Sequence, residues 1–125
     1  MSRKSEELND RLSRHRQIKL SVVGRKSGKT ISIPVWFVRE GDTLYLLPVR
    51  GTETQWYRNM LHNPSIRIEA RGAESEFRIR PINKSAAVKS VIEKFREKYG
   101  AKDMKKYYSK FDVAVIAKLA GILET

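Results

Sequence analysis

The sequence predicts a mainly β domain, a barrel of about six mostly antiparallel strands with helices at its periphery. Segments rich in β-branched residues alternate apolar and polar side chains, most clearly where Ile66 and Ile68 alternate with Arg67 and Glu69. Glycine-containing turns separate several of these segments, which favours hairpins. Six strands in a chain of only 125 residues favour a barrel with one core.

The strand assignments rest on this alternation and on turn residues. Pro34 lies inside the second segment, so that strand is expected at a sheet edge or bulge, because proline cannot donate a ladder hydrogen bond. The last segment has alanines that permit a helix, but Val113 and Val115 begin an alternating series, which favours a closing strand. The expected strands are Gln17–Val23, Thr30–Arg39, Leu44–Val49, Ser65–Ala70, Glu74–Pro81 and Asp112–Leu119.

Three helices are expected. Ser5–Arg16 is a polar, helical arm before the barrel, within a single domain that spans residues 1–125. A capping box from Thr52 to Gln55 predicts a helix that starts at Thr52 and ends at Asn63–Pro64. Asn83 is the expected N-cap of a helix that runs to Tyr99 and ends at a glycine. Lys102–Lys110 is expected to be a basic connector.

Composition excludes several function classes. The chain has no cysteine, which rules out disulfides, thiolate metal sites and cysteine nucleophiles, and agrees with a cytoplasmic location. No secretory signal is expected, and the longest apolar stretch is too short to span a bilayer. His15 and His62 have no carboxylate or histidine at ligand spacing, so no metal site and no hydrolytic triad are expected.

The net charge of +12 is unevenly distributed. Residues 1–30 and residues 84–110 each hold nine Lys or Arg against three Asp or Glu, whereas residues 31–83 are almost neutral. Such a field favours anionic partners, and it predicts weak, salt-sensitive binding of nucleic acid or another polyanion. A solvated lysine-rich surface is an equally good explanation of the charge alone.

The segment Gly24–Thr30 has the chemistry of a phosphate-binding loop. It nearly spells a P-loop, but one residue is missing before Gly28-Lys29-Thr30, and a strand follows instead of a helix, so a nucleotide triphosphatase is rejected. Its glycines permit close backbone approach to an anion, and its basic residues add charge. An ordinary basic hairpin loop remains the alternative.

Several motifs together resemble the deazaflavin-dependent nitroreductase family, which belongs to the split β-barrel group that includes pyridoxamine-phosphate oxidases. The resemblance covers about residues 18–82. A weaker similarity follows in Tyr107-Tyr108 and residues 112–115. The motifs are Gly24-Arg25-Lys26-Ser27-Gly28-Lys29, Pro34-Val35-Trp36-Phe37-Val38, Gly41-Asp42, Trp56-Tyr57-Arg58-Asn59-Met60 and Asn63-Pro64.

The resemblance implies a split β-barrel that binds the deazaflavin coenzyme F-420 or FMN, and it is compatible with a homodimer. The basic loop would hold the cofactor's phosphate and acidic tail, Pro34 and Val35 would lie along its ring, and Tyr107 and Tyr108 would line the substrate side. The chain departs from the family at Ile31, where family members often carry an arginine, and this leaves room for FMN. The implied cofactor-binding residues are Arg25, Lys26, Ser27, Gly28, Lys29, Pro34, Val35, Arg50, Gly51, Trp56 and Tyr57.

The leading functional interpretation is an oxidoreductase of the nitroreductase or quinone-reductase kind, in which the bound cofactor exchanges hydride with a small organic acceptor. The main alternative is a non-enzymatic binder of nucleic acid or another polyanion, because lysines and tyrosines interleave in residues 105–110. A cofactor carrier, or a barrel without activity, is a third interpretation. Trp56 and Tyr57 have helical spacing, which favours core packing over ring stacking. Trp36 fits either the barrel interior or the pocket.

Overall fold

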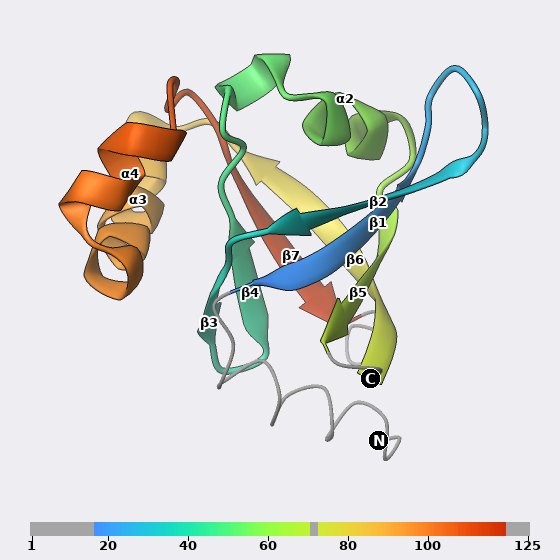
Figure 1. Cartoon of the computed structure of the whole chain (residues 1–125), viewed down its shortest axis with the longest axis horizontal. Helices are drawn as coiled ribbons and strands as arrows, with labels where there is room; N and C mark the ends of the chain where they lie inside the picture. Colours follow the sequence, from blue (N-terminus) through green and yellow to red (C-terminus); the bar gives the residue numbers. More distant parts are fainter. Residues whose placement is uncertain (1–16, 71–72, 120–125) are drawn as a thin grey trace.

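The computed structural model describes residues 17–70 and 73–119, and its centre is one antiparallel sheet of seven strands that curls into a half-barrel (Figure 1). Across the sheet the strand order is β2-β1-β5-β6-β7-β4-β3. The strands are β1 (Ile18–Val23), β2 (Thr30–Val35), β3 (Val38–Glu40), β4 (Thr43–Leu46), β5 (Ser65–Ala70), β6 (Ala73–Ile82) and β7 (Ala114–Leu119). The expected barrel of mostly antiparallel strands with peripheral helices is confirmed.

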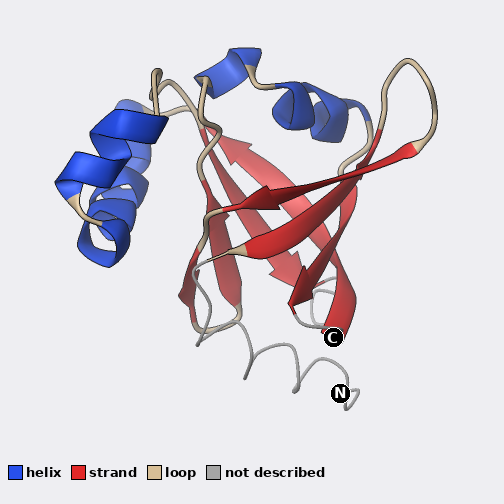
Figure 2. Ribbon diagram, in the orientation of Figure 1, coloured by secondary structure: helices blue, strands red, loops and turns tan. Residues whose placement is uncertain are grey.

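The inner face of the curled sheet forms the main hydrophobic core. Leu20 of β1 pairs with Ile33 of β2 on one side and with Ile68 of β5 on the other, and both Leu20 and Ile68 are fully buried. The short helix α2 (Gln55–His62) lies across the open end of the barrel (Figure 2) and contributes Met60 to the same core. Alternation along β1, β5 and β6 therefore places apolar side chains inward, as the sequence predicted.

A second core lies between the outer face of the sheet and two helices, α3 (Ser85–Tyr99) and α4 (Ala101–Tyr107). These helices lie beside β3 and β4 in Figure 1. The buried residues of this second core include Leu47, Phe95 and Met104. The apolar positions of α3 recur at helical spacing, so one stripe of the helix is buried, whereas Lys89 is exposed and Lys94 and Lys98 are half-buried.

The strand expected over Thr30–Arg39 is two strands. β2 ends at Val35 and lies at one edge of the sheet, whereas β3 begins at Val38 and lies at the other edge. The chain leaves the ladder at Phe37, whose N–H donates to the Tyr99 hydroxyl (3.1 Å) and whose C=O accepts from that hydroxyl (2.9 Å). The phenol thus replaces a strand partner at this point. The edge position expected from Pro34 is confirmed.

The capping box predicted at Thr52 does not form. Residues Gly51–Glu53 are a 3₁₀ turn, η1, and α2 begins only at Gln55. The Thr52 hydroxyl donates to Asp112 (2.8 Å), while the Thr54 hydroxyl accepts from the N–H of Arg50 (2.9 Å), so both threonines bond outside the helix. The expected end of the helix before Pro64 is confirmed.

The remaining differences between the expected and the observed elements lie after β6. Lys102–Lys110 was expected to be a connector, but most of it forms α4, which packs on α3. Lys84 rather than Asn83 occupies the N-cap position of α3, without a side-chain hydrogen bond. The expected strand over Asp112–Leu119 is confirmed as β7, which begins at Ala114. The predicted arm, Ser5–Arg16, lies outside the described residues.

Candidate functional site

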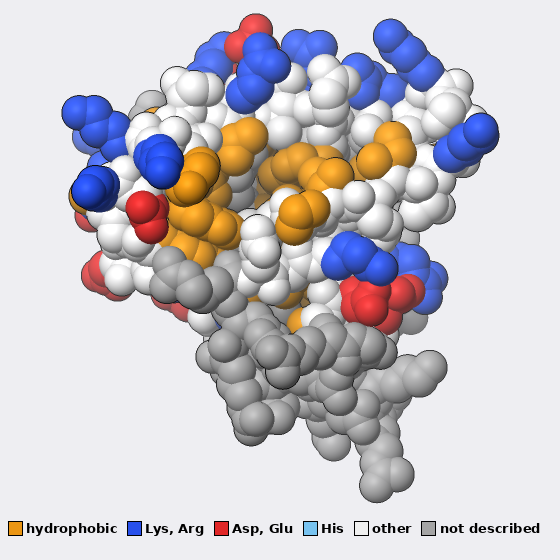
Figure 3. All heavy atoms as spheres, viewed as in Figure 1, with side chains coloured by type: hydrophobic (Ala, Val, Ile, Leu, Met, Phe, Trp, Pro, Cys, Tyr) orange, Lys and Arg blue, Asp and Glu red, His pale blue; other side chains and the backbone are white. Residues whose placement is uncertain are grey.

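A cavity of about 460 Å³ opens between the end of β2, the chain after β4, the start of α2 and the end of α4. In Figure 3 apolar side chains gather in the middle of this face, and Lys and Arg side chains surround them toward the upper and outer edges. Its volume falls in the range of small-molecule and cofactor sites. The lining residues are Gln17, Ile33, Pro34, Val35, Trp36, Leu47, Val49, Trp56, Tyr107 and Tyr108.

One wall of the cavity is aromatic. The indole of Trp36 stacks on the ring of Tyr99. Tyr107 meets the same indole edge-on and Tyr108 meets it at a tilt, with ring centroids 5.5 and 5.8 Å away. Such rings offer a flat apolar surface that loses little conformational entropy on binding. This wall suits a planar ring system.

The two tyrosines at the cavity differ in exposure. Tyr107 is 54% exposed, whereas Tyr108 is buried. Burial, with a smaller contribution from Tyr99, raises the pKa of Tyr108 far above its ordinary value. The Tyr108 hydroxyl therefore keeps its proton at neutral pH and is able to donate a hydrogen bond, but it is unsuited to act as a base.

The basic loop between β1 and β2 lies against α2. The guanidinium of Arg25 donates to Asn59 Oδ1 (2.7 Å) and to Gln55 Oε1 (3.0 Å). Lys26 and Lys29 are exposed. A strand rises about 3.3 Å per residue, so the start of β2 beside this loop lies roughly 10 Å from Ile33 in the cavity. An elongated ligand with an apolar ring and an anionic tail is able to reach both.

The strand face between the loop and the cavity is apolar. Ile31 and Ile33 share one face of β2, and Ile31 is 41% exposed. Ile31 is the residue that departs from the arginine often found in the resembling family. Its position adds hydrophobic surface, and no charge, along the route from the loop to the cavity.

The segment that holds Arg50 and Gly51 is fixed by Asp112. The Asp112 carboxylate accepts from the Thr52 N–H (2.9 Å) as well as from its hydroxyl, and Lys110 Nζ lies 3.6 Å from the same carboxylate. Gly51 has a φ of +56° and a Cβ there would lie 2.0 Å from Asp112 Oδ1, so only glycine fits. This contact ties the chain after β4 to the chain before β7, on both sides of the cavity.

The predicted site residues fall into three groups. Pro34, Val35, Trp56, Tyr107 and Tyr108 line the cavity, and Trp56 also belongs to the main core, as its spacing suggested. The residues of the basic loop lie together beside α2. Arg50 and Gly51 belong to the segment fixed by Asp112, and Tyr57 is a core residue away from the cavity lining.

Sequence reasoning missed Gln17, Ile33, Leu47 and Val49 in the cavity lining, and it left Trp36 undecided. Leu47 and Val49 come directly after a strand and are apolar, like core residues. The local sequence therefore does not distinguish a cavity-lining position from a core position here. Trp36 lines the cavity and packs against the second core at the same time.

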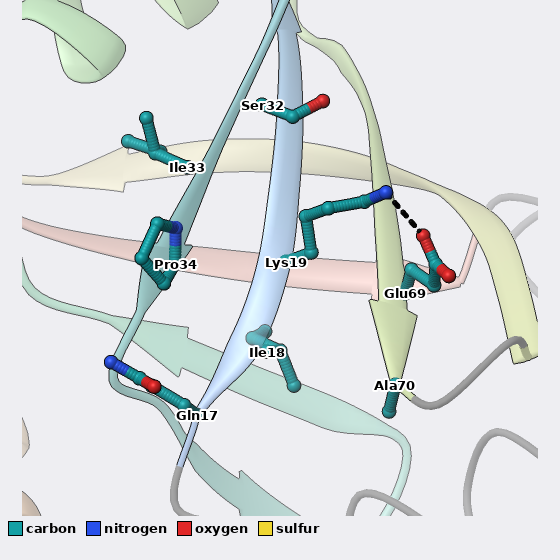
Figure 4. A pocket seen from close by; sticks show the side chains of 8 residues that line it. All are labelled: Gln17, Ile18, Lys19, Ser32, Ile33, Pro34, Glu69 and Ala70. Carbon is teal, nitrogen blue, oxygen red and sulfur yellow. Dashed lines mark ion pairs between the residues drawn. The ribbon is translucent and has the colours of Figure 1, made fainter.

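A second hollow, of about 410 Å³, lies on the outer face of β1, β2 and β5 and shares Gln17, Ile33 and Pro34 with the cavity (Figure 4). There Lys19 Nζ pairs with Glu69 Oε1 at 2.6 Å, and nearby the hydroxyls of Ser21 and Ser32 bond each other at 2.7 Å. Because its lysine is already neutralised by Glu69, this hollow suits an anionic ligand less well than the cavity beside the basic loop.

The described residues offer neither a metal cluster nor a membrane-spanning helix. Within residues 17–70 and 73–119, no cluster of three or more His, Cys, Asp or Glu side chains is arranged to hold a metal ion. The helices of this part of the chain are all too short or too polar to cross a membrane.

Comparison with known proteins identifies the family. Residues 8–117 match the model of a family described as "Uncharacterized protein conserved in bacteria (DUF2255)". The chain belongs to the DUF2255 family. A search of curated proteins finds no match to this DUF2255 chain.

Solved structures share the fold of this DUF2255 protein at low sequence identity. An F420-H2 dependent reductase matches with a TM-score of 0.64 and 16% identity over 83% of this chain and 95% of its own. A putative pyridoxamine 5'-phosphate oxidase from Listeria innocua matches at 0.65 and 15%, over 92% and 91%. The heme storage protein HutZ from Vibrio cholerae matches at 0.67 and 15%, over 94% and 90%. These likenesses show the split-barrel fold.

Proposed function

We propose that this DUF2255 protein binds a flavin-type redox cofactor, the deazaflavin coenzyme F-420 or FMN, and that it is an oxidoreductase acting on a small organic acceptor. The observation that carries the proposal is the pairing of an apolar, aromatic-walled cavity with a basic loop about 10 Å along the same strand. Two proteins of the same fold support it, one an F420-H2 dependent reductase and the other a putative pyridoxamine 5'-phosphate oxidase.

The residues present fit such a cofactor. When bound, the cofactor supplies the hydride chemistry, while the protein provides binding, orientation and electrostatics. Lys26 and Lys29 hold the phosphate and acidic tail, because charge-assisted hydrogen bonds to phosphate are stronger than neutral ones. Val35, Val49 and Trp36 surround the ring and exclude water.

The tyrosines face the acceptor in this proposal. Tyr107 is exposed at the mouth of the cavity, so it contacts an acceptor molecule that enters from solvent. Tyr108 is protonated at neutral pH and offers a hydrogen bond to an acceptor oxygen. Neither residue is required to change its own oxidation state. The proposed acceptor is a small organic molecule. We further propose that the protein is cytoplasmic and forms a homodimer.

Two alternatives draw less support from the geometry. A heme protein usually supplies an axial histidine, methionine, cysteine or tyrosine, and the cavity lining offers only tyrosines for that role. A polyanion binder would use the lysines of residues 84–110, but Lys94 pairs with Glu40 and Lys98 bonds the C=O of Phe37, so part of that charge is engaged within the fold.

The proposal is tested with a substitution that fills the cavity at a position outside the buried core. Val49→Trp adds bulk at a half-exposed lining position, and Leu61→Trp adds the same bulk at an exposed position of α2 outside the lining. Binding of FMN and of coenzyme F-420 is followed by difference absorption spectra. We expect V49W to lose binding at least tenfold and L61W to match the wild type. Equal affinity in V49W would place the ring elsewhere and overturn the assignment.

A further inference from the structure

The side chain of Asn59 is buried on α2, 5% exposed, and its Oδ1 faces the basic loop. This single oxygen accepts two hydrogen bonds from Arg25, one from the backbone N–H (3.1 Å) and one from Nη1 (2.7 Å). A buried amide oxygen that receives a charged donor is a strong contact, and losing it would leave polar groups unsatisfied. Asn59 thus fixes both the backbone and the side chain of Arg25.

Arg25 is in turn clamped against the helix. Its Nη2 donates to Gln55 Oε1 (3.0 Å), one helical turn before Asn59, so the guanidinium bridges two side chains on the same face of α2. The planar guanidinium binds Asn59 Oδ1 and Gln55 Oε1 at the same time. A lysine ammonium lacks the two separate nitrogens that this geometry needs. The contacts of the guanidinium with α2 therefore stabilise the conformation of the loop.

The remaining loop bonds leave one side open. Gly24 N–H donates to Lys29 O (2.8 Å), Gly28 N–H to Gly24 O (2.9 Å), and Lys29 N–H to Ser27 Oγ (3.1 Å). Within the described part of the chain, the N–H groups of Lys26 and Ser27 have no acceptor. These two consecutive N–H groups precede Gly28, whose φ is +71°, and both are available as donors to an anion.

We propose that Asn59 is the positioning residue of an anion site made by the N–H groups of Lys26 and Ser27 and the ammonium groups of Lys26 and Lys29. This inference rests on the proposed function, because the anion is the phosphate of the bound cofactor. Asn59 acts through Arg25: it holds the loop in the one arrangement that directs these donors outward. In this arrangement Arg25 supports the loop from the side of α2, whereas the resemblance implied that it contacts the cofactor.

The test uses variants that separate the acceptor from the volume of Asn59. Asn59→Leu keeps a similar size and removes the acceptor, and Asn59→Asp restores an oxygen that Arg25 binds with added charge. Arg25→Lys keeps the charge at a half-buried position but cannot make the bridge, so it serves if N59L does not fold. Arg58→Lys is the matched control, because Arg58 is exposed on the same helix and outside the loop.

Two readouts are taken on each folded variant. Hydrogen exchange of the amides of residues 25–29 is measured without cofactor, and FMN and coenzyme F-420 affinities are measured by titration calorimetry. We expect N59L and R25K to exchange faster in the loop and to bind about tenfold more weakly, with N59D and R58K close to the wild type.

The outcomes separate this inference from the proposed function. Unchanged loop exchange in N59L, or faster exchange with unchanged affinity, would overturn the positioning role while cofactor binding stands. Absence of binding by the wild type would overturn the proposed function, and the anion assignment with it.

Discussion

The indole of Trp36 lies face to face with the ring of Tyr99, with centroids 4.1 Å apart and planes 7° apart. The Tyr99 hydroxyl also bonds the N–H and the C=O of Phe37, the residue that follows Trp36. One phenol therefore ends β2, starts the crossing to β3 and supports the aromatic wall of the cavity. The wall is held from behind by α3, so its shape is set by the fold before any ligand binds.

Tyr99→Phe tests this support. The ring and its stacking remain, but the buried N–H of Phe37 loses its partner, so unfolding free energy should fall by about 1–3 kcal/mol. Chemical denaturation measures the change. Tyr107→Phe is the control, because Tyr107 is 54% exposed and should change stability little. Equal stability of Y99F and the wild type would show that the hydroxyl does not fix this crossing.

The double change Lys26→Ala and Lys29→Ala tests the anionic end of the site. Each lost charge-assisted contact removes about 1.5–3 kcal/mol, which is roughly ten- to hundredfold in affinity, so the double change should weaken binding of FMN or deazaflavin by at least that much. The melting temperature should stay nearly constant, because exposed charges contribute little to folding. Lys84→Ala with Lys89→Ala removes the same charge from exposed positions of α3 and should leave affinity unchanged. A loss of affinity in both double variants would indicate a general field effect.

Asp112 predicts a defined pH dependence of stability. Its partial burial raises its pKa, but the hydrogen bonds from Thr52 and the charge of Lys110 outweigh this, so the pKa lies below the ordinary value of 3.8. A group whose folded pKa is depressed stabilises the fold above its unfolded pKa and loses that contribution as pH falls through the folded value. Stability supplied by Asp112 is thus complete near neutrality and disappears in acid.

Melting curves of Asp112→Asn and the wild type between pH 7 and pH 2 measure this contribution. We expect D112N to melt at a lower temperature than the wild type at pH 7, and the gap to close as the solution becomes more acidic than about pH 4. Asp42→Asn, in an exposed turn, corrects for the loss of one carboxylate. A gap that stays constant across this pH range would exclude the carboxylate as its source.

Ile31→Arg tests whether the uncharged face of β2 limits the affinity for coenzyme F-420. An arginine at this position lies between the loop and the cavity, so it should strengthen binding of coenzyme F-420, whose tail carries phosphate and glutamate groups, by about tenfold at low salt. The gain should shrink at high ionic strength. Ser32→Arg, on the opposite face of the strand, should give no gain. Equal gains from both would mean that the tail does not follow this face.

The parts of the fold that sequence predicted are those fixed by local pattern. The alternation in β1, β5, β6 and β7 depends on which face of a strand meets the core, and neighbouring residues carry that information. The capping box failed because Thr52 finds its partner in Asp112, 60 positions away in the chain. The split of the second strand likewise depends on Tyr99, far along α3, so no local pattern could reveal it.

The site was predictable to a similar degree. Glycine-bounded charge identified the basic loop, and the resemblance supplied Pro34, Val35 and the two tyrosines that now line one cavity. The resemblance implied that Arg25 binds the cofactor, and that role stays a prediction. Its bonds to Asn59 and Gln55 became visible only in three dimensions. Leu47 and Val49 resemble core residues, so only the curvature of the sheet brings them to the cavity.

The proposed function requires that this cavity and its basic loop hold a flavin-type cofactor. Titration calorimetry of the wild-type protein with FMN, coenzyme F-420 and heme, each under the same conditions, tests it most directly. We expect saturable binding of one molecule per chain for FMN or coenzyme F-420, and weaker binding of heme. Heme binding with no measurable binding of either flavin-type cofactor, or no binding of all three, would contradict it.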